Sequence, residues 1–218
     1  MRLNIRTFVA PGFGENSYIA WRDDVEEAVA IDPGNSAPSL LRTFEEEGLE
    51  LAAVLLTHAH LDHIEGVARL VRDTHAPVYL HPADRFLYDH ATQQALQFGV
   101  RMDTPPPVNH ALQHGQRLEL GRVVYDVRHV PGHSPGHVIF YVADAGCAFV
   151  GDVVFQGSIG RTDLPGGDFT QLIGAIRAQV LSLSDDTVLY PGHGPETTVG
   201  HERTTNPFLI PHYGGGFG

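Results

Sequence analysis

Residues 57–63, Thr-His-Ala-His-Leu-Asp-His, carry four side chains that can bind a metal ion. In an extended chain, side chains two residues apart point the same way, so His58 and His60 can direct their imidazoles at one point. If the chain then turns into a helix, Asp62 and His63 can face a second point nearby. Neutral imidazole and carboxylate groups suit zinc or iron. The segment therefore predicts a metal centre.

The same segment also has two interpretations that need no metal. Asp62 and Glu65 could cap the start of a helix through a reciprocal pair of hydrogen bonds. The clustered histidines could instead lie on a solvated loop. Taken alone, the segment does not decide between these interpretations and a metal site.

Three further polar residues occur in glycine-rich turns at the ends of predicted strands. His133 lies within Pro-Gly-His-Ser-Pro-Gly-His, and His193 lies within Pro-Gly-His-Gly. Asp152 follows the apolar run at residues 148–150 and one glycine. Glycine lets the backbone approach closely at such points. Each residue alone is typical of a turn, but together with the 57–63 cluster they favour one shared metal site.

Apolar runs and turn residues predict the elements that would position these side chains. Strands are expected at residues 3–9, 17–21, 28–32, 51–56, 78–81, 117–120, 123–129, 138–142, 148–150 and 188–190. Helices are expected at residues 39–47, 64–72, 85–98, 169–180 and 201–206. This order suits an α/β protein with two mixed sheets packed together and helices outside. We expect one domain over residues 1–211 and a flexible tail at residues 212–218.

Composition limits the partners and the compartment. The 218 residues carry a formal charge of −12, and all 14 basic residues are arginine. A nucleic-acid partner is not expected, because such a protein must neutralise phosphates. No apolar run approaches the ~18 residues of a membrane span, and no apolar signal-peptide core is found. The single cysteine, Cys147, suits a reducing compartment, so we expect a cytoplasmic protein that acts on a small molecule.

The order His-x-His-x-Asp-His, followed by a histidine, an aspartate and a histidine at successive strand ends, resembles the metallo-β-lactamase superfamily. The resemblance covers nearly the whole chain and implies a four-layer αββα sandwich of two mixed sheets with outer helices. It also assigns the ligands of two divalent metal ions by position. The first metal would be held by His58, His60 and His133. The second would be held by Asp62, His63 and His193, and Asp152 would bridge both.

Two stretches narrow the resemblance to the glyoxalase II branch, the hydroxyacylglutathione hydrolases. Residues 151–163 and 191–207 are similar to those of short bacterial glyoxalase II-like proteins. Arg161 stands where that branch carries a lysine that holds a glutathione carboxylate, and arginine can bind a carboxylate through two hydrogen bonds. The branch also has a C-terminal helical domain with further glutathione contacts, and this chain ends about where that domain would begin. The resemblance therefore implies thioester hydrolysis and leaves the thiol carrier open.

The resemblance implies a thioesterase that cleaves S-(hydroxyacyl)glutathione or a similar thioester with a hydroxide generated at the two metals. Zinc is the expected metal, with iron or manganese as alternatives. Asp62 would orient the attacking group, and Asp152 would hold both metals in place. His137 is a rival of His133 as a ligand, but the family pattern makes it, like Asp163, a hydrogen-bond partner behind the ligands.

Three other functions remain open. A glutathione persulfide dioxygenase of the same fold uses one iron and shares Gly-Arg-Thr-Asp, but typically has Pro-Ala-His-Asp-Tyr where this chain has Pro-Gly-His-Gly-Pro at residues 191–195. A lactonase or another small-ester hydrolase would use the same ligands. A metal-binding protein without catalysis is disfavoured, because every ligand position is intact. Phe86, Tyr88 and Phe98 could line an acyl pocket, although core packing is their expected role.

Overall fold

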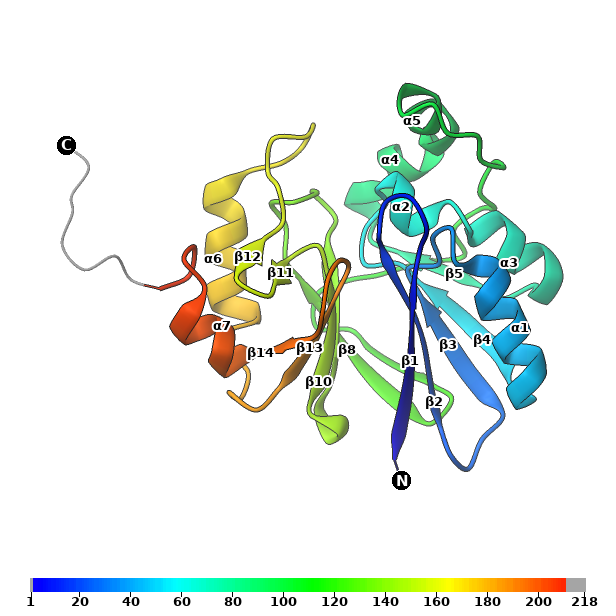
Figure 1. The fold of residues 1–218 in the computed structure, drawn as a ribbon, viewed down its shortest axis with the longest axis horizontal. Helices are drawn as coiled ribbons and strands as arrows, with labels where there is room; N and C mark the ends of the chain where they lie inside the picture. The colour runs from blue at the N-terminus through cyan, green and yellow to red at the C-terminus, as the bar shows by residue number, and fades with distance from the viewer. Residues whose placement is uncertain (1, 211–218) are drawn as a thin grey trace.

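The computed structural model describes residues 2–210, and the predicted tail at residues 212–218 lies outside them. Its main strands form two six-stranded sheets that face each other (Figure 1). The first sheet has the order β1 (Leu3–Val9), β2 (Asn16–Arg22), β3 (Glu27–Ile31), β4 (Glu50–Leu55), β5 (Val78–Leu80) and β6 (His110–Ala111). The second has the order β14 (Thr197–Thr198), β13 (Val188–Pro191), β10 (Cys147–Gly151), β9 (Val138–Val142), β8 (Val123–His129) and β7 (Arg117–Leu120). A separate hairpin joins β11 (Val154–Phe155) to β12 (Ser158–Ile159).

Both sheets are mixed, and their parallel strands bring several chain ends to one edge. In the first sheet, β3, β4, β5 and β6 are parallel, whereas β1 and β2 run antiparallel to their neighbours. In the second sheet, β10 and β13 are parallel. Parallel neighbours end at the same edge of a sheet, so the segments that follow β3 and β4, and those that follow β10 and β13, lie next to each other in pairs.

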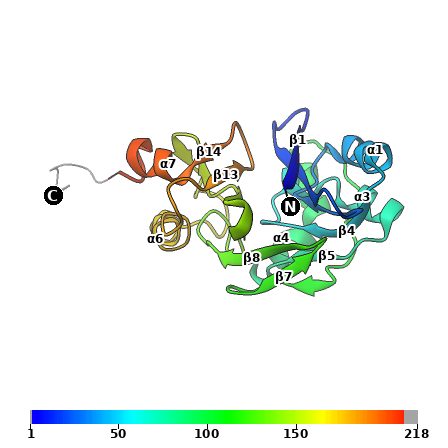
Figure 2. The same cartoon turned by 90° about the horizontal axis from the view of Figure 1, so that it is seen from below.

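Helices cover the outer faces of the two sheets (Figure 2). The first sheet is covered by α1 (Ala37–Glu47) and α3 (Val67–Thr74), and the second by α6 (Phe169–Gln179) and α7 (Val199–Thr205). The short helices α2 (Leu61–Ile64), α4 (Arg85–Asp89) and α5 (Ala91–Gln97) follow β4 and β5. One apolar core lies between the sheets, and another lies under the helices on each side. The predicted four-layer αββα sandwich is therefore confirmed.

The central strands are apolar on both faces because both faces are buried. In β4, Val54 packs beneath the helices of the first sheet, whereas Leu55 packs between the sheets. In β10, Ala148 packs beneath α6 and Phe149 packs between the sheets. Side chains alternate along a strand, so a strand with two buried faces needs a continuous apolar run. Such runs made these strands predictable.

Two predicted helices are interrupted. The helix expected at residues 64–72 is divided into α2 and α3 at Gly66, whose N–H donates to the carbonyl oxygen of Pro33 at 3.0 Å. A Cβ on Gly66 would collide with the carbonyl oxygen of Gly34, so this close approach requires glycine. The helix expected at residues 85–98 is divided at His90, which leaves the helical region at φ −105°. The two-residue strands β6, β11, β12 and β14 were not predicted, because they are too short for a periodic pattern.

The packing at Gly66 can be tested by adding one methyl group. Gly66→Ala should lower the free energy of unfolding by about 1–3 kcal/mol, because the Cβ meets backbone that cannot move freely. Gly174→Ala is the matched control, since Gly174 lies within α6 and its Cβ would meet nothing within 4 Å. That substitution should raise the free energy of unfolding by up to ~1 kcal/mol. Urea denaturation measures both, and equal effects would contradict the account of the break.

Candidate metal centre

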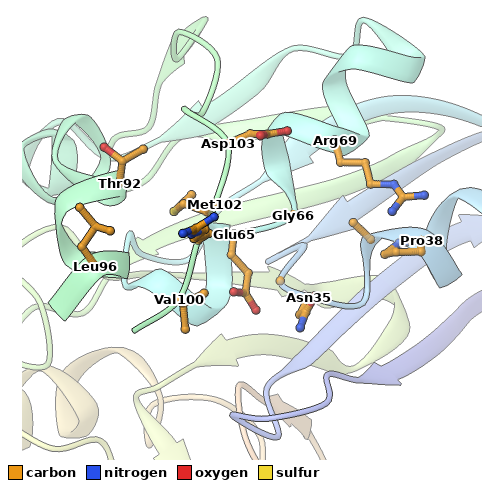
Figure 3. Close-up of a pocket in the computed structure, with 13 residues that line it drawn as sticks. Asn35, Pro38, Glu65, Gly66, Arg69, Thr92, Leu96, Val100, Met102 and Asp103 are labelled. Carbon is orange, nitrogen blue, oxygen red and sulfur yellow. The ribbon is translucent and has the colours of Figure 1, made fainter. Parts of the chain in front are cut away.

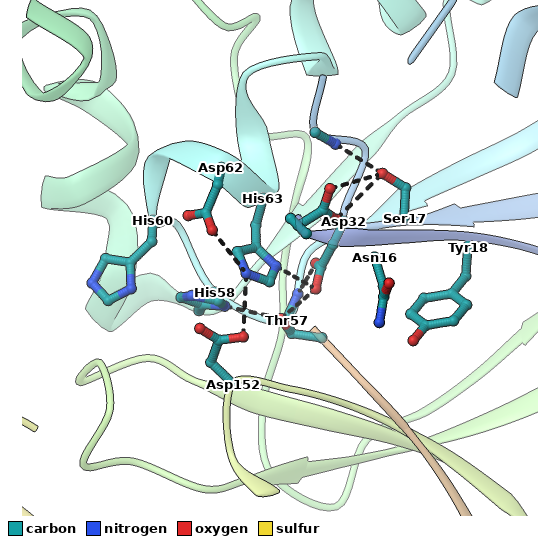
Figure 4. Close-up of polar contacts among 12 residues, drawn as sticks. Asn16, Ser17, Tyr18, Asp32, Thr57, His58, His60, Asp62, His63 and Asp152 are labelled. Atoms are coloured by element: carbon teal, nitrogen blue, oxygen red, sulfur yellow. Dashed lines mark hydrogen bonds and ion pairs between the residues drawn. The ribbon is translucent and has the colours of Figure 1, made fainter. Parts of the chain in front are cut away.

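Four segments from both sheets meet at one edge of the sandwich, and Figure 4 shows His58, His60, Asp62, His63 and Asp152 there. The segment after β4 carries His58 and His60 and continues into α2, which carries Asp62 and His63. The other three segments are the turn between β8 and β9, the end of β10 and the end of β13. They carry, in this order, His133, Asp152 and His193. All seven predicted ligands therefore come together.

The first group consists of His58, His60 and His133, whose ligand atoms lie within 4.8 Å of one another. The Nε2 atom of His133 is 3.3 Å from Nε2 of His58 and 2.8 Å from Nδ1 of His60. Two nitrogen atoms that share a tetrahedral zinc ion at about 2.1 Å lie roughly 3.4 Å apart. The group thus has the size of a metal site with three nitrogen ligands.

The second group consists of Asp62, His63 and His193, which also lie within 4.8 Å of one another. Oδ2 of Asp62 is 3.1 Å from Nε2 of His193 and 3.8 Å from Nε2 of His63. Asp152 lies between the two groups. Its Oδ1 is 3.3 Å from His63 Nε2, and its Oδ2 is 3.5 Å from His133 Nε2. One carboxylate thus faces both groups, as a bridging ligand must.

The donor set fits metal ions better than it fits hydrogen bonds alone. Within residues 2–210, Nε2 of His63 and Oδ1 of Asp152 are buried and make no hydrogen bond. Buried polar atoms are normally paired, so each unpaired one calls for an explanation. A metal ion held by the second group would accept a lone pair from each of these two atoms. Asp32, His58 and His63 also cluster, but there Asp32 accepts hydrogen bonds from the N–H and the hydroxyl of Thr57 at 2.7 and 2.6 Å.

Hydrogen bonds behind the ligands fix which imidazole nitrogen faces the centre. His63 Nδ1 lies 3.1 Å from Oδ2 of Asp32, and His58 Nδ1 lies 3.0 Å from Oγ1 of Thr57. His133 Nδ1 lies 2.8 Å from the carbonyl oxygen of Arg161. An imidazole that donates through Nδ1 keeps the Nε2 lone pair for a metal. The sequence did not single out Asp32 or Thr57.

Asp84 is a second residue that the sequence analysis missed. It is buried in the first turn after β5, and its Oδ2 accepts hydrogen bonds from Ala59 N at 3.1 Å and Ser134 Oγ at 2.7 Å. Its Oδ1 accepts from Gly136 N at 2.5 Å. One carboxylate therefore fixes the segment that carries His58 and His60 to the turn that carries His133.

His137 and Asp163 were both predicted to support the ligands through hydrogen bonds, but His137 is buried beside the ligands and Asp163 is exposed. His137 is buried, its ring stacks on His58 at 4.6 Å, and its Nε2 accepts a hydrogen bond from the backbone N–H of Asp152 at 3.0 Å. It thus positions the bridging residue through the backbone. Asp163 is exposed and binds Arg161 through two hydrogen bonds of 2.7 Å each. The carbonyl oxygen of Arg161 in turn lies 2.8 Å from Nδ1 of His133, so Asp163 is linked to this predicted ligand only through Arg161.

The imidazoles of the two groups differ in their affinity for protons. Burial lowers the pKa of His58, and burial together with the neighbouring His133 lowers the pKa of His60 to about 3. Burial also disfavours the charged form of His63, but the carboxylates of Asp152 and Asp62 outweigh it and raise that pKa. His58 and His60 are therefore neutral at physiological pH, with lone pairs free for a metal.

The two carboxylates are ionised despite their burial. Burial by itself would raise the pKa of Asp152, but the imidazoles of His63 and His133 hold it well below its usual range. The pKa of Asp62 is likewise lowered, because His63 and His193 outweigh the effect of its burial. Both side chains can thus act as anionic ligands at neutral pH.

The centre forms the floor of a cavity of about 610 Å³. Above the ligands, the cavity is lined by the side chains of Phe13, Phe86, Phe98, Arg161 and Leu164. Of the three aromatic residues that were expected to pack in the core, one does so and two line the cavity instead. Tyr88 is buried in the core, as expected, and its hydroxyl donates to the carbonyl oxygen of Pro106 at 2.9 Å. Phe86 and Phe98 are exposed to the cavity and do not pack in the core.

Comparisons with known proteins agree with this geometry. A sequence profile of the metallo-β-lactamase superfamily matches residues 10–193, and the chain belongs to that superfamily. The hydroxyacylglutathione hydrolase GloC of Haemophilus influenzae is 40% identical over 95% of this chain and 98% of its own length. The crystal structure of TTHA1623 in a di-iron-bound form matches with a TM-score of 0.86 and 44% sequence identity. The match covers 94% of this chain and 100% of that chain. The crystal structure of BLEG-1, a B3 metallo-β-lactamase, has a TM-score of 0.89 and 40% identity over 95% of this chain and 100% of that one. Membership of this superfamily supports the conclusion that the protein is a metal-dependent hydrolase.

Acid should release metal from the two groups at different pH values. The pKa values of His63 and His193 are raised, so in the metal-free protein a metal must displace protons there. Those of His58 and His60 are lowered, so protons compete at these nitrogens only at lower pH. As the pH falls, roughly half of the bound zinc should leave first, from the second group. Metal analysis after dialysis at graded pH measures this, and loss of all zinc in one step would contradict it.

Asp32 should support the second group specifically. Asp32→Ala removes the acceptor for His63 Nδ1, which should weaken metal binding at the second group by about 10- to 100-fold and affect the first group less. Asp163→Ala is the control, because Asp163 is an exposed aspartate with its contacts at Arg161. Zinc titration with a competing chelator gives both affinities, and circular dichroism checks that the variant is folded. An Asp32→Ala protein with two unchanged affinities would contradict this role.

Proposed function

We propose that this protein is a thioesterase of glyoxalase II type that acts on S-(hydroxyacyl)glutathione or a similar thioester. The observation that carries the proposal is that seven potential metal ligands meet at the floor of a cavity that also contains an arginine, Arg161. The Haemophilus influenzae relative named hydroxyacylglutathione hydrolase supports the same substrate class. Two divalent metals bound by these residues would supply a bound water with a pKa lowered towards ~7 and would polarise a carbonyl oxygen.

The chain's own residues do the positioning in this reaction. The carboxylate of Asp62 faces the cavity beside His193, where it can accept a hydrogen bond from the attacking water and orient it towards the carbonyl carbon. The buried carboxylate of Asp152 contacts His63 of the second group and His133 of the first, and so keeps the two groups next to each other. The thiolate that leaves is stable at neutral pH, so its departure needs little help from a general acid.

Zinc is our proposed metal, because nitrogen-rich sites with carboxylates suit it. The same ligand set accepts iron or manganese. The di-iron-bound form of TTHA1623 makes iron a specific alternative. Metal analysis of the protein purified without added metal distinguishes among them.

The setting we propose is a cytoplasmic one with a small-molecule substrate and no nucleic-acid or membrane partner. The net charge of −12 repels phosphate-rich partners. The buried thiol of Cys147 makes no disulfide. No helix within residues 2–210 is both long enough and apolar enough to cross a membrane.

The direct test supplies the zinc-loaded protein with S-lactoylglutathione and other glutathione thioesters and follows thiol release. We expect turnover with multiple thioesters and its loss in Asp62→Ala. Parallel assays offer glutathione persulfide to the iron-loaded protein and a lactone to the zinc-loaded protein. Oxygen uptake with persulfide, without cleavage of any thioester, would instead assign a dioxygenase, and cleavage of the lactone alone would assign a lactonase.

The ion pair between Arg161 and Asp163 gives this proposal a pair of opposite predictions. Arg161→Ala should raise KM for a glutathione thioester by about two- to fivefold and leave kcat unchanged, because it removes an exposed contact to a substrate carboxylate. Asp163→Ala should lower KM, because it frees the Arg161 guanidinium from its present partner. Steady-state kinetics of both variants decide the point. KM changes of the same sign would show that Arg161 does not bind the thiol carrier.

A further inference from the structure

The cavity over the metal centre has an aromatic wall, formed by Phe13, Phe86 and Phe98. Their exposed fractions are 41%, 46% and 59%, so all three rings leave apolar surface open to the cavity. Concave sites with apolar walls and a few polar groups are typical of small-molecule binding. The aromatic wall is therefore a candidate contact surface for part of the substrate.

The aromatic wall is assembled from segments far apart in the sequence. Phe13 lies at the tip of the β1–β2 hairpin between Gly12 and Gly14, both with positive φ. Phe98 follows α5, and its ring meets the ring of Phe13 edge to face at 6.1 Å between centroids. Aromatic pairs in this arrangement attract each other, which holds the two segments together at the cavity.

The hairpin tip also places the aromatic wall beside the second group of ligands. The backbone of Glu15, two residues after Phe13, forms a β-bridge with His193. On another side of the cavity, Arg161 follows β12, and its carbonyl oxygen is hydrogen-bonded to His133 of the first group. Among the described lining residues, Arg161 is the one lysine or arginine side chain. The Phe13–Phe98 pair thus lies near the second group, whereas Arg161, paired with Asp163, lies near the first group with Leu164 and Pro165 beside it.

A thioester carbonyl has two substituents, and the two parts of the cavity differ in what they favour. A thiol carrier with carboxylates fits beside Arg161. The acyl group then faces the phenylalanine rings, which offer an acyl hydroxyl no hydrogen-bond partner, while the polar side chains of His90, Gln94 and Gln97 line another part of the cavity. An alkyl or aromatic acyl group would lose nothing and would bury apolar surface.

We propose that the aromatic wall is the acyl subsite, and that the enzyme prefers thioesters with an apolar acyl group of several carbons over short hydroxyacyl groups. This inference rests on the proposed thioesterase activity and specifies its substrate class. Phe13 and Phe98 act through contact with the acyl chain, and Phe86 extends the same wall beside Leu87.

The test is a series of glutathione thioesters with lactoyl, acetyl, butanoyl, hexanoyl and phenylacetyl groups. In the wild-type protein, kcat/KM should rise by about two- to fourfold per added methylene up to hexanoyl. Phe98→Ala and Phe13→Ala should flatten this dependence, and Phe98→Leu should restore part of it. The lactoyl thioester should be slower than the butanoyl thioester.

Leu96→Ala is the matched control. Leu96 belongs to α5, is 69% exposed, and lines a different hollow, between α1, α3 and the segment after α5 (Figure 3). Like Phe98→Ala, this variant removes a large apolar side chain from the region of α5. Its kcat/KM should nevertheless keep the wild-type dependence on acyl chain length. If it flattened the series as Phe98→Ala does, a general loosening of α5 would explain both, and the subsite would be wrong.

Two further results would overturn the proposal. Equal kcat/KM values across the series would refute the acyl subsite while leaving the thioesterase activity intact. A dependence on chain length that is unchanged in Phe98→Ala would refute the contact of Phe98 with the acyl chain. If sedimentation also showed the wild-type protein as a dimer and Phe98→Ala as a monomer, the aromatic wall would be assigned to contact with a second copy of the chain. If no thioester is cleaved, the proposed function fails separately. Calorimetry with ketone analogues, in which a methylene replaces the thioester sulfur, then decides: affinity that grows with chain length supports the subsite, and constant affinity refutes it.

Discussion

The contact of the Asp152 carboxylate with imidazoles from both halves of the protein is the interaction on which the site depends. Asp152 lies 3.3 Å from His63, which follows a strand of the first sheet, and 3.5 Å from His133, which belongs to a turn of the second. A buried carboxylate is strongly unfavourable unless it is paired with positive charge or metal. The strand ends that carry these residues must therefore lie close together, and the apolar core between the two sheets holds them in that position.

The same constraint separates a rigid floor from a more variable wall. The ligands follow buried strands and are held from behind by Asp32, Thr57 and Asp84, so their positions are determined by the core. The substrate side is built from the tip of a hairpin, two short helices and the segment after β12. Sites of this kind keep the chemistry constant on a rigid scaffold, while surface segments determine which substrate is bound.

A feature of this arrangement could be predicted from the sequence only where it left a recognisable pattern of residues. The long strands were predictable because continuous apolar runs are a strong signal. The meeting of the seven predicted ligands was predictable because the order of these histidines and aspartates resembles the metallo-β-lactamase superfamily. Asp32 and Asp84 were missed, since a lone polar residue after a strand looks like any turn residue until its partners are known. Asp32 follows β3 as Asp152 follows β10, so the strand-end rule applied to both could have found it.

The aromatic residues and the broken helices depended on contacts distant in sequence. The exposure of Phe98 is set by the cavity and by its contact with Phe13, neither of which leaves a trace in the local pattern of α5. The break at Gly66 is set by the backbone of residues 33–34, which approaches from another part of the chain. Local periodicity predicted one continuous helix there because it contains no information about that approach.

Anomalous diffraction from crystals of the zinc-loaded protein tests the central claim most directly. The account predicts two peaks, one among His58, His60 and His133 and the other among Asp62, His63 and His193, with the Asp152 carboxylate between them. A single peak at the first group would contradict a two-metal centre. A peak among Asp32, His58 and His63 would contradict the assignment of ligands itself.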